Sequence, residues 1–373
     1  MVLNKKVIKT LLVILITPLL TGCFNYKDIN KVTFATSMIF DVDEFDNVQL
    51  YIESIKPYRS TNDSSDKGKR IIYKGEGKTV LEAIRDINMA SSNNINFSQN
   101  RAYIFTEKSA KLGLNNYLNL VNNNQEFQIK PSLYIYYGNV QELLEISSND
   151  EEYLGTYLSE MTQRNKFNPR VMESNINTYL NNILVGSKTN VIGSIEVRKD
   201  ALDKKIELSG AAVIKDNRLI ERLDKEQGLS YNLLMGEIER GTLEVANPQD
   251  KGSYVTLEIL ESNSKCKLEK KDGGFILHRT VNIKTTLGEA QNKLIIDGKT
   301  LNEIKSNKEE DIKKYVVDLF ETYKKNGIDI FKVKREMEIK FPHEDIENPI
   351  EVTDFDLDVN ISIDGTGVIK NTI

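Results

Sequence analysis

Apolar residues recur along this chain with two distinct periods, which predict strands in some stretches and helices in others. Within residues 355–363 every second residue is apolar, the pattern of a strand with one buried face. A spacing of three to four residues predicts one apolar helix face made of Ile312, Tyr315, Val316, Leu319, Phe320 and Tyr323. Ser306 and Glu309 form a capping box ahead of this face, so we expect the helix to begin there and to end at Asn326 and Gly327.

The N-terminal half shows strand and helix signals in alternation. Apolar alternation predicts strands at residues 32–36 and 48–54, separated by the acidic turn 41–47. Thr79 with Glu82 is a capping box before a helix. Further elements are expected at residues 102–105 (strand), 107–121 (helix), 132–137 (strand), 153–161 (helix), 172–184 (helix) and 191–197 (strand). Strands alternating with helices indicate an α/β unit.

The C-terminal half is predicted to be richer in strands. Residues 208–214 and 219–223 flank a turn-type cluster and read as a hairpin. Asp224 with Gln227 caps a following helix, which Gly236 ends. Later elements are expected at residues 255–260, 264–268 and 275–287 (strands) and 330–340 (helix).

These elements predict an α+β or mixed α/β protein of three mixed-sheet domains with packed helices. At 373 residues the chain is long enough for two or three domains. We expect a leader at residues 1–22, an N-terminal region at 23–200 with two α/β subdomains, the second near 70–150, and a C-terminal domain at 205–373. The charged stretch 199–205 is the expected boundary.

The first 23 residues have the order of a secretory signal. Lys5, Lys6 and Lys9 precede an apolar run at residues 11–20, and Thr21 and Gly22 are small. That run is far shorter than the roughly 20 residues of a permanent membrane span. Leu20, Thr21, Gly22 and Cys23 resemble the lipobox of bacterial lipoproteins. The resemblance implies a diacylglyceryl thioether on Cys23 and cleavage between Gly22 and Cys23, and two acyl chains suffice for stable anchoring.

Charge and cysteine content narrow the possible functions. The net charge of −5 becomes −8 once the three lysines of the leader are removed, which disfavours nucleic-acid binding. With Cys23 lipidated, Cys266 has no partner in the chain, so no internal disulfide is expected. Its neighbours alternate as in a strand, which predicts a small buried residue rather than a reactive thiol.

The stretches that resemble cofactor-binding or metal-binding motifs lack the residue spacing that those motifs require. The stretch Gly75 to Thr79 lacks the first glycine of a phosphate loop, because Ile72 stands there. Asp354, Asp356 and Asp358 open like a calcium loop, but the positions that need glycine and glutamate are Val359 and Gly365. His278 and His343 have no ligand at zinc spacing. We therefore expect no enzyme, no cofactor and no metal site.

Several stretches together resemble one family, the Ger(x)C lipoproteins of bacterial spore germinant receptors. Residues 23–30 (CFNYKDIN) are similar to the mature start of that family, with Phe24 where a tryptophan is typical. The similarity continues in the stretches GEGKTVLEA (75–83), GAAVIKD (210–216), 224–236, 241–245, DIFKVKREMEIKFP (329–342) and 365–369. These stretches occur in the family's order over nearly the whole chain.

The resemblance implies a non-enzymatic subunit, anchored to the outer face of the spore inner membrane. Its partners would be two multispanning proteins, a channel-like A subunit and a transporter-like B subunit, with which it would act in nutrient-triggered germination. The alternative is a lipoprotein solute-binding protein that captures a small nutrient itself. That reading expects a cleft between two lobes, lined by polar and aromatic groups.

Overall fold

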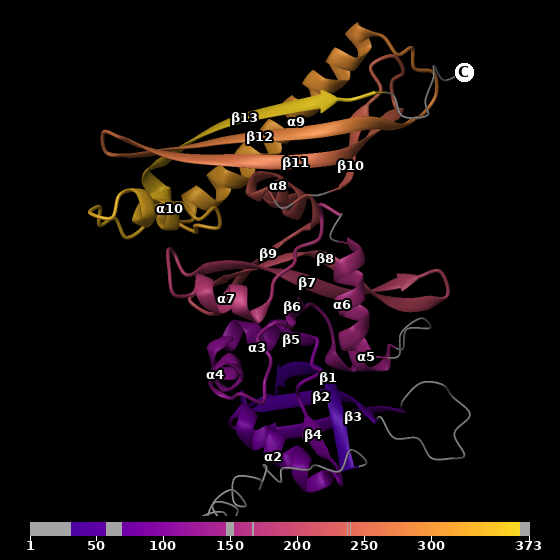
Figure 1. Cartoon of the computed structure of the whole chain (residues 1–373), viewed down its shortest axis with the longest axis vertical. Coiled ribbons are helices and arrows are strands. Elements are labelled where there is room, and N and C mark those ends of the chain that lie inside the picture. The colour runs from indigo at the N-terminus through magenta and orange to yellow at the C-terminus, as the bar shows by residue number, and fades with distance from the viewer. Residues whose placement is uncertain are drawn as a thin grey trace, which may run out of the picture.

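The described strands form two separate sheets, arranged one above the other in an elongated molecule (Figure 1). The structure is a computed structural model, and it describes residues 31–56, 69–146, 153–165, 168–236, 238 and 240–365. The mixed α+β class is confirmed. The sequence predicts three mixed-sheet domains, whereas the described residues form two mixed sheets, because all described strands from Val32 to Leu223 join a single sheet.

The first sheet has parallel strands in its middle and antiparallel strands on both sides. Its order is β3-β2-β1-β5-β6-β7-β8-β9, with β4 paired to the start of β1. The middle strands β1, β5, β6 and β7 run parallel. The bounds of its strands are β1 (Val32–Val42), β2 (Val48–Lys56), β3 (Lys69–Gly77), β4 (Asn94–Asn96), β5 (Ala102–Thr106), β6 (Ser132–Tyr136), β7 (Thr189–Asp200), β8 (Asp203–Lys215) and β9 (Arg218–Leu223).

Helices cover both faces of this sheet, and each layer buries its own core. Ile84, Leu118 and Tyr179 lie in the core of one layer, opposite Met38 and Phe40 of β1. That layer consists of α2 (Val80–Ala90), α3 (Glu107–Leu112), α4 (Asn115–Asn123) and α7 (Ile176–Asn182). The other face packs against α5 (Val140–Glu145) and α6 (Leu154–Asn165). Burial on both faces explains why the middle strands are apolar nearly throughout.

The second sheet has the order β10-β11-β12-β13 and is covered on one face by helices. Its elements are α8 (Lys225–Met235), β10 (Gly241–Ala246), β11 (Tyr254–Lys271), β12 (Gly274–Ala290), α9 (Gly298–Lys325), α10 (Val333–Lys340), the 3-10 turn η3 (Pro349–Val352) and β13 (Thr353–Ile363). β13 runs parallel to β12, and the other pairs are antiparallel. No helix among the described residues is both long and apolar enough to span a membrane.

The two sheets are joined by one continuous core. Ala211 and Leu223 of the first sheet share a cluster with Leu234 of α8 and with Phe331, before α10. Hydrogen bonds reinforce the junction: Ser187 Oγ donates to the carbonyl oxygen of Asp329 (3.0 Å), Lys215 Nζ to that of Gly327 (3.1 Å), and Gly186 N to Glu338 Oε2 (2.9 Å).

Some expected boundaries are wrong in detail. The charged stretch 199–205, predicted as a domain boundary, lies at the turn of a hairpin in the first sheet, because β7 and β8 pair as far as Asp200 and Asp203. The helix expected to begin at Ser306 begins at Gly298, where the Asp297 side chain accepts from Thr300 N (2.7 Å). The strands expected at 255–260 and 264–268 are one strand, β11. The helix expected at 107–121 is divided at Gly113 into α3 and α4, and α10 starts at Val333, three residues later than predicted.

Candidate functional site

The predicted lipidation site cannot be placed in the fold. Gly22 and Cys23 lie outside the described residues, as does the whole leader. The described chain enters the first sheet at Val32, beside Asn94 of β4, which follows α2. The structure therefore identifies the end of the fold to which an anchor at Cys23 would be tethered.

Cys266 lies in β11 and is half-buried, with its side chain against the core of the second sheet. The predicted strand is confirmed, although the residue is less enclosed than expected. Burial raises the pKa of its thiol, although the positive charge of Arg279 acts in the opposite direction. A raised pKa leaves little thiolate at neutral pH, so the residue is a poor nucleophile.

The glycines of the stretch 75–79 serve packing. A side chain at Gly75 would collide with the carbonyl oxygen of Ala83, so this strand approaches α2 more closely than any other residue allows. Thr79 Oγ1 accepts from Glu82 N (3.2 Å), and the Glu82 carboxylate accepts from Lys78 N (2.7 Å). The predicted helix cap is therefore confirmed.

The three acidic residues of β13 face solvent and are individually paired. Asp354 makes an ion pair with Lys271, whose hydrogen bond lowers the pKa of that carboxyl group. Asp356 Oδ2 lies 2.8 Å from His278 Nδ1, and Asp358 lies 3.6 Å from Lys313. Among the described residues, no three histidine, cysteine, aspartate or glutamate side chains group as metal ligands would.

Glu53 of β2 is an almost fully buried acid whose role the sequence did not indicate. Arg70 Nε donates to Glu53 Oε1 (2.6 Å), while Thr36 Oγ1 (2.8 Å) and the backbone N of Gly155 (3.3 Å) donate to Oε2. Arg70 Nη1 also donates to the carbonyl oxygen of Leu144 (3.1 Å). The carboxylate thus joins β1, β2 and β3 to α5 and α6. Its hydrogen-bond partners compensate the cost of burying the charge.

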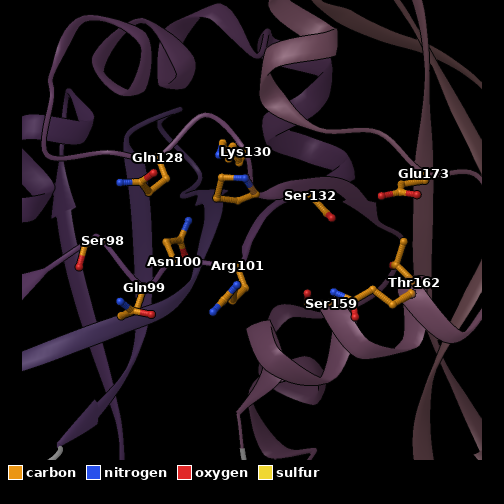
Figure 2. A pocket seen from close by; sticks show the side chains of 12 residues that line it. Ser98, Gln99, Asn100, Arg101, Gln128, Lys130, Ser132, Ser159, Thr162 and Glu173 are labelled. Carbon is orange, nitrogen blue, oxygen red and sulfur yellow. The ribbon is translucent and has the colours of Figure 1, made fainter.

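A polar pocket of about 310 Å³ opens at the amino ends of β5 and β6 (Figure 2). It lies beside the first sheet, not between the two sheets. Three segments line it: the loop before β5, the loop before β6, and the end of α6 with the chain after it. Its lining residues are Ser98, Gln99, Asn100, Arg101, Gln128, Lys130, Pro131, Ser132, Ser159, Thr162, Gln163 and Glu173. None of these is aromatic, which differs from the cleft that the solute-binding alternative expects.

Backbone and side-chain hydrogen bonds to neighbouring elements hold the pocket wall in place. Arg101 N donates to the carbonyl oxygen of Thr36 (2.9 Å), and the Tyr103 hydroxyl donates to that of Gln128 (2.9 Å). On the helix side, the buried Thr162 hydroxyl lies 2.5 Å from the Tyr134 hydroxyl. Both lining loops are therefore fixed by the sheet that they precede.

Sequence reasoning missed this pocket because its residues lie on polar loops without periodicity. A usable signal was nevertheless present. Asn100 and Arg101 directly precede one predicted strand, and Lys130 precedes the next. Had the two strands been recognised as parallel neighbours, these residues would have been expected at one edge of the sheet.

Comparison with known proteins identifies the family. Residues 25–197 match the spore germination protein N-terminal domain, and residues 209–367 match the spore germination B3/GerAC-like C-terminal domain. The chain is 21% identical over 322 residues to spore germination protein GerQC of Bacillus cereus, covering 86% of this chain and 87% of that protein. It is 24% identical to spore germination protein B3 of Bacillus subtilis (strain 168), covering 73% and 72% of the two chains.

A solved structure agrees with the fold. The crystal structure of the GerBC protein superposes with a TM-score of 0.55 at 18% sequence identity, covering 90% of this chain and 99% of that one. The fold and the two matched regions define a spore germination protein. The chain belongs to the Ger(x)C family, as the sequence resemblance predicts.

Proposed function

We propose that this chain is the lipid-anchored C subunit of a spore nutrient germinant receptor. The observation that carries the proposal is the match of both halves of the chain to spore germination domains, downstream of a leader that ends at Leu20, Thr21, Gly22 and Cys23. The subunit acts on the outer face of the spore inner membrane, through contacts with a channel-like A subunit and a transporter-like B subunit. It works without catalysis and without a cofactor.

Anchoring at Cys23 would orient the molecule. Eight residues, 24–31, lie between Cys23 and Val32, the first residue of β1, so nine Cα-to-Cα steps join the two. A fully extended chain spans at most about 3.5 Å per residue, so this tether reaches roughly 30 Å. The end of the first sheet where β1 and β4 begin therefore lies near the bilayer. The second sheet lies at the opposite end of the elongated molecule and projects away from the bilayer (Figure 1).

Co-purification from spore membranes tests the partner proposal. The full chain, tagged at its C-terminus and solubilised in mild detergent, should retain both multispanning partners through affinity capture. The matched control is Cys23→Ala, which keeps the folded body but removes the anchor and should reduce recovery of the partners. Capture of the wild-type chain with neither multispanning protein would contradict the proposal.

A further inference from the structure

The pocket at the amino ends of β5 and β6 carries opposite charges on different walls (Figure 2). Arg101 and Lys130 come from the two loops that precede the strands, whereas Glu173 lies across the opening beside α6. Arg101, Lys130 and Glu173 make no ion pair with another described residue. We propose that this pocket binds a small zwitterion of the amino-acid class, with its carboxylate at Arg101 and Lys130 and its ammonium group toward Glu173.

Asn100 is the second observation that points to a ligand. Its side chain is only 4% exposed and lines the pocket. Neither Oδ1 nor Nδ2 makes a hydrogen bond of good geometry within the described part of the chain, although the side chain lies close to the Tyr103 hydroxyl, which donates to the carbonyl oxygen of Gln128. Buried side-chain amides are nearly always paired, so an orphaned one at a pocket wall marks a place where a ligand or water supplies the partner. An amide both donates and accepts, which suits a molecule that carries a carboxylate and an ammonium group.

The pocket also suits such a ligand in size and rigidity. A volume of about 310 Å³ exceeds that of a free amino acid and leaves room for a polar side chain beside Ser159 and Gln163. Because the lining loops are hydrogen-bonded to the sheet, little ordering is needed when a ligand binds. The polar walls favour a hydrophilic ligand over an apolar one.

This proposal goes beyond receptor assembly and can fail independently of it. The test uses the full chain in detergent micelles, titrated with L-glutamine in a calorimeter. Acetate and methylammonium each present one charged half of the ligand. We expect L-glutamine to bind and each half to bind at least about tenfold more weakly. Acetate binding as tightly as L-glutamine would overturn the zwitterion assignment, as would no heat of binding up to about 10 mM L-glutamine.

Two charge-removing substitutions locate the binding within the pocket. Arg101→Gln and Glu173→Gln change exposed residues, so the fold should persist while affinity for L-glutamine falls about tenfold. Their matched controls are Arg85→Gln on α2 and Glu303→Gln on α9, which should leave the affinity unchanged.

Asn100→Leu separates binding from stability. Leucine has a similar shape and removes two unpaired polar atoms, so we expect loss of L-glutamine binding together with an unchanged or higher unfolding temperature. Unaltered affinity in Asn100→Leu would overturn the site, and so would equal losses in the pocket variants and their controls.

Discussion

At the scale of single residues, the buried acid Glu53 illustrates how burial and pairing determine a side chain's importance. Its partner Arg70 has a side chain 20% exposed, while that of Glu53 is 1% exposed. We expect Arg70→Ala to lower the free energy of unfolding by about 3 kcal/mol, because the carboxylate would remain buried without its cation. Urea denaturation of the purified chain measures this change.

The control for this prediction is an exposed ion pair. Lys111 and Glu107 form an i,i+4 pair on α3 with side chains 59% and 46% exposed. Lys111→Ala should cost at most about 0.5 kcal/mol. Equal effects of the two substitutions would show that the Glu53 contacts contribute no more than a surface pair does.

Because the chain has two cysteines, the number of free thiols reports whether Cys23 is lipidated. If Cys23 carries a thioether, the mature chain has one titratable thiol, that of Cys266. In denaturant we expect one thiol per chain from an aromatic disulfide reagent, and two from the unprocessed precursor. Without denaturant the reaction should be slow at neutral pH and accelerate as the pH rises, because burial raises the pKa of the Cys266 thiol. Two thiols in the mature chain would contradict lipidation.

At the scale of elements, α9 begins at a different residue from the one that the local sequence pattern predicts. The capping-box pattern predicts Ser306 as the cap, whereas the structure has Asp297 accepting from Thr300 N. Asp297→Ala should therefore destabilise the protein by about 1 kcal/mol. Ser306→Ala, within the helix, should be neutral or slightly stabilising, because alanine is the better helix former. Thermal unfolding measures the stability of both variants. A larger loss of stability in Ser306→Ala than in Asp297→Ala would indicate that the helix begins at Ser306.

Elements with strong hydrophobic periodicity were predictable from the sequence, but the strands that pair with one another were not. The helix face of Ile312 to Tyr323 and the capping box of Asp224 and Gln227 are local patterns. Both are confirmed except at Tyr315, which was predicted to lie on the buried face and is 61% exposed. The pairing of β7 with β8 was missed, because a charged stretch resembles a linker when the strands beside it are not known to be neighbours. In the structure these charged residues lie on the paired ends of β7 and β8, next to the turn of that hairpin. The pocket was missed for the same reason, since it depends on which strands lie side by side.

At the scale of the whole molecule, the shared core predicts cooperative unfolding. The two family regions meet between residues 197 and 209, yet the first sheet continues to Leu223 and its last strands pack against α8. We expect a single thermal transition, seen alike by far-ultraviolet circular dichroism and by tyrosine fluorescence. Arg70→Ala in the first sheet and Asp297→Ala beside the second should both shift it. Two separated transitions, each moved by only one substitution, would show independent domains instead.

Germination of spores tests the central claim, a lipid-anchored receptor subunit, most directly. Spores carrying Cys23→Ala in place of the wild-type chain, and spores lacking the chain, should respond poorly to the nutrients that the wild type senses. Both should still germinate normally with an agent that bypasses the nutrient receptors. Loss of refractility and release of dipicolinate follow the response. A normal nutrient response in both strains would contradict the claim.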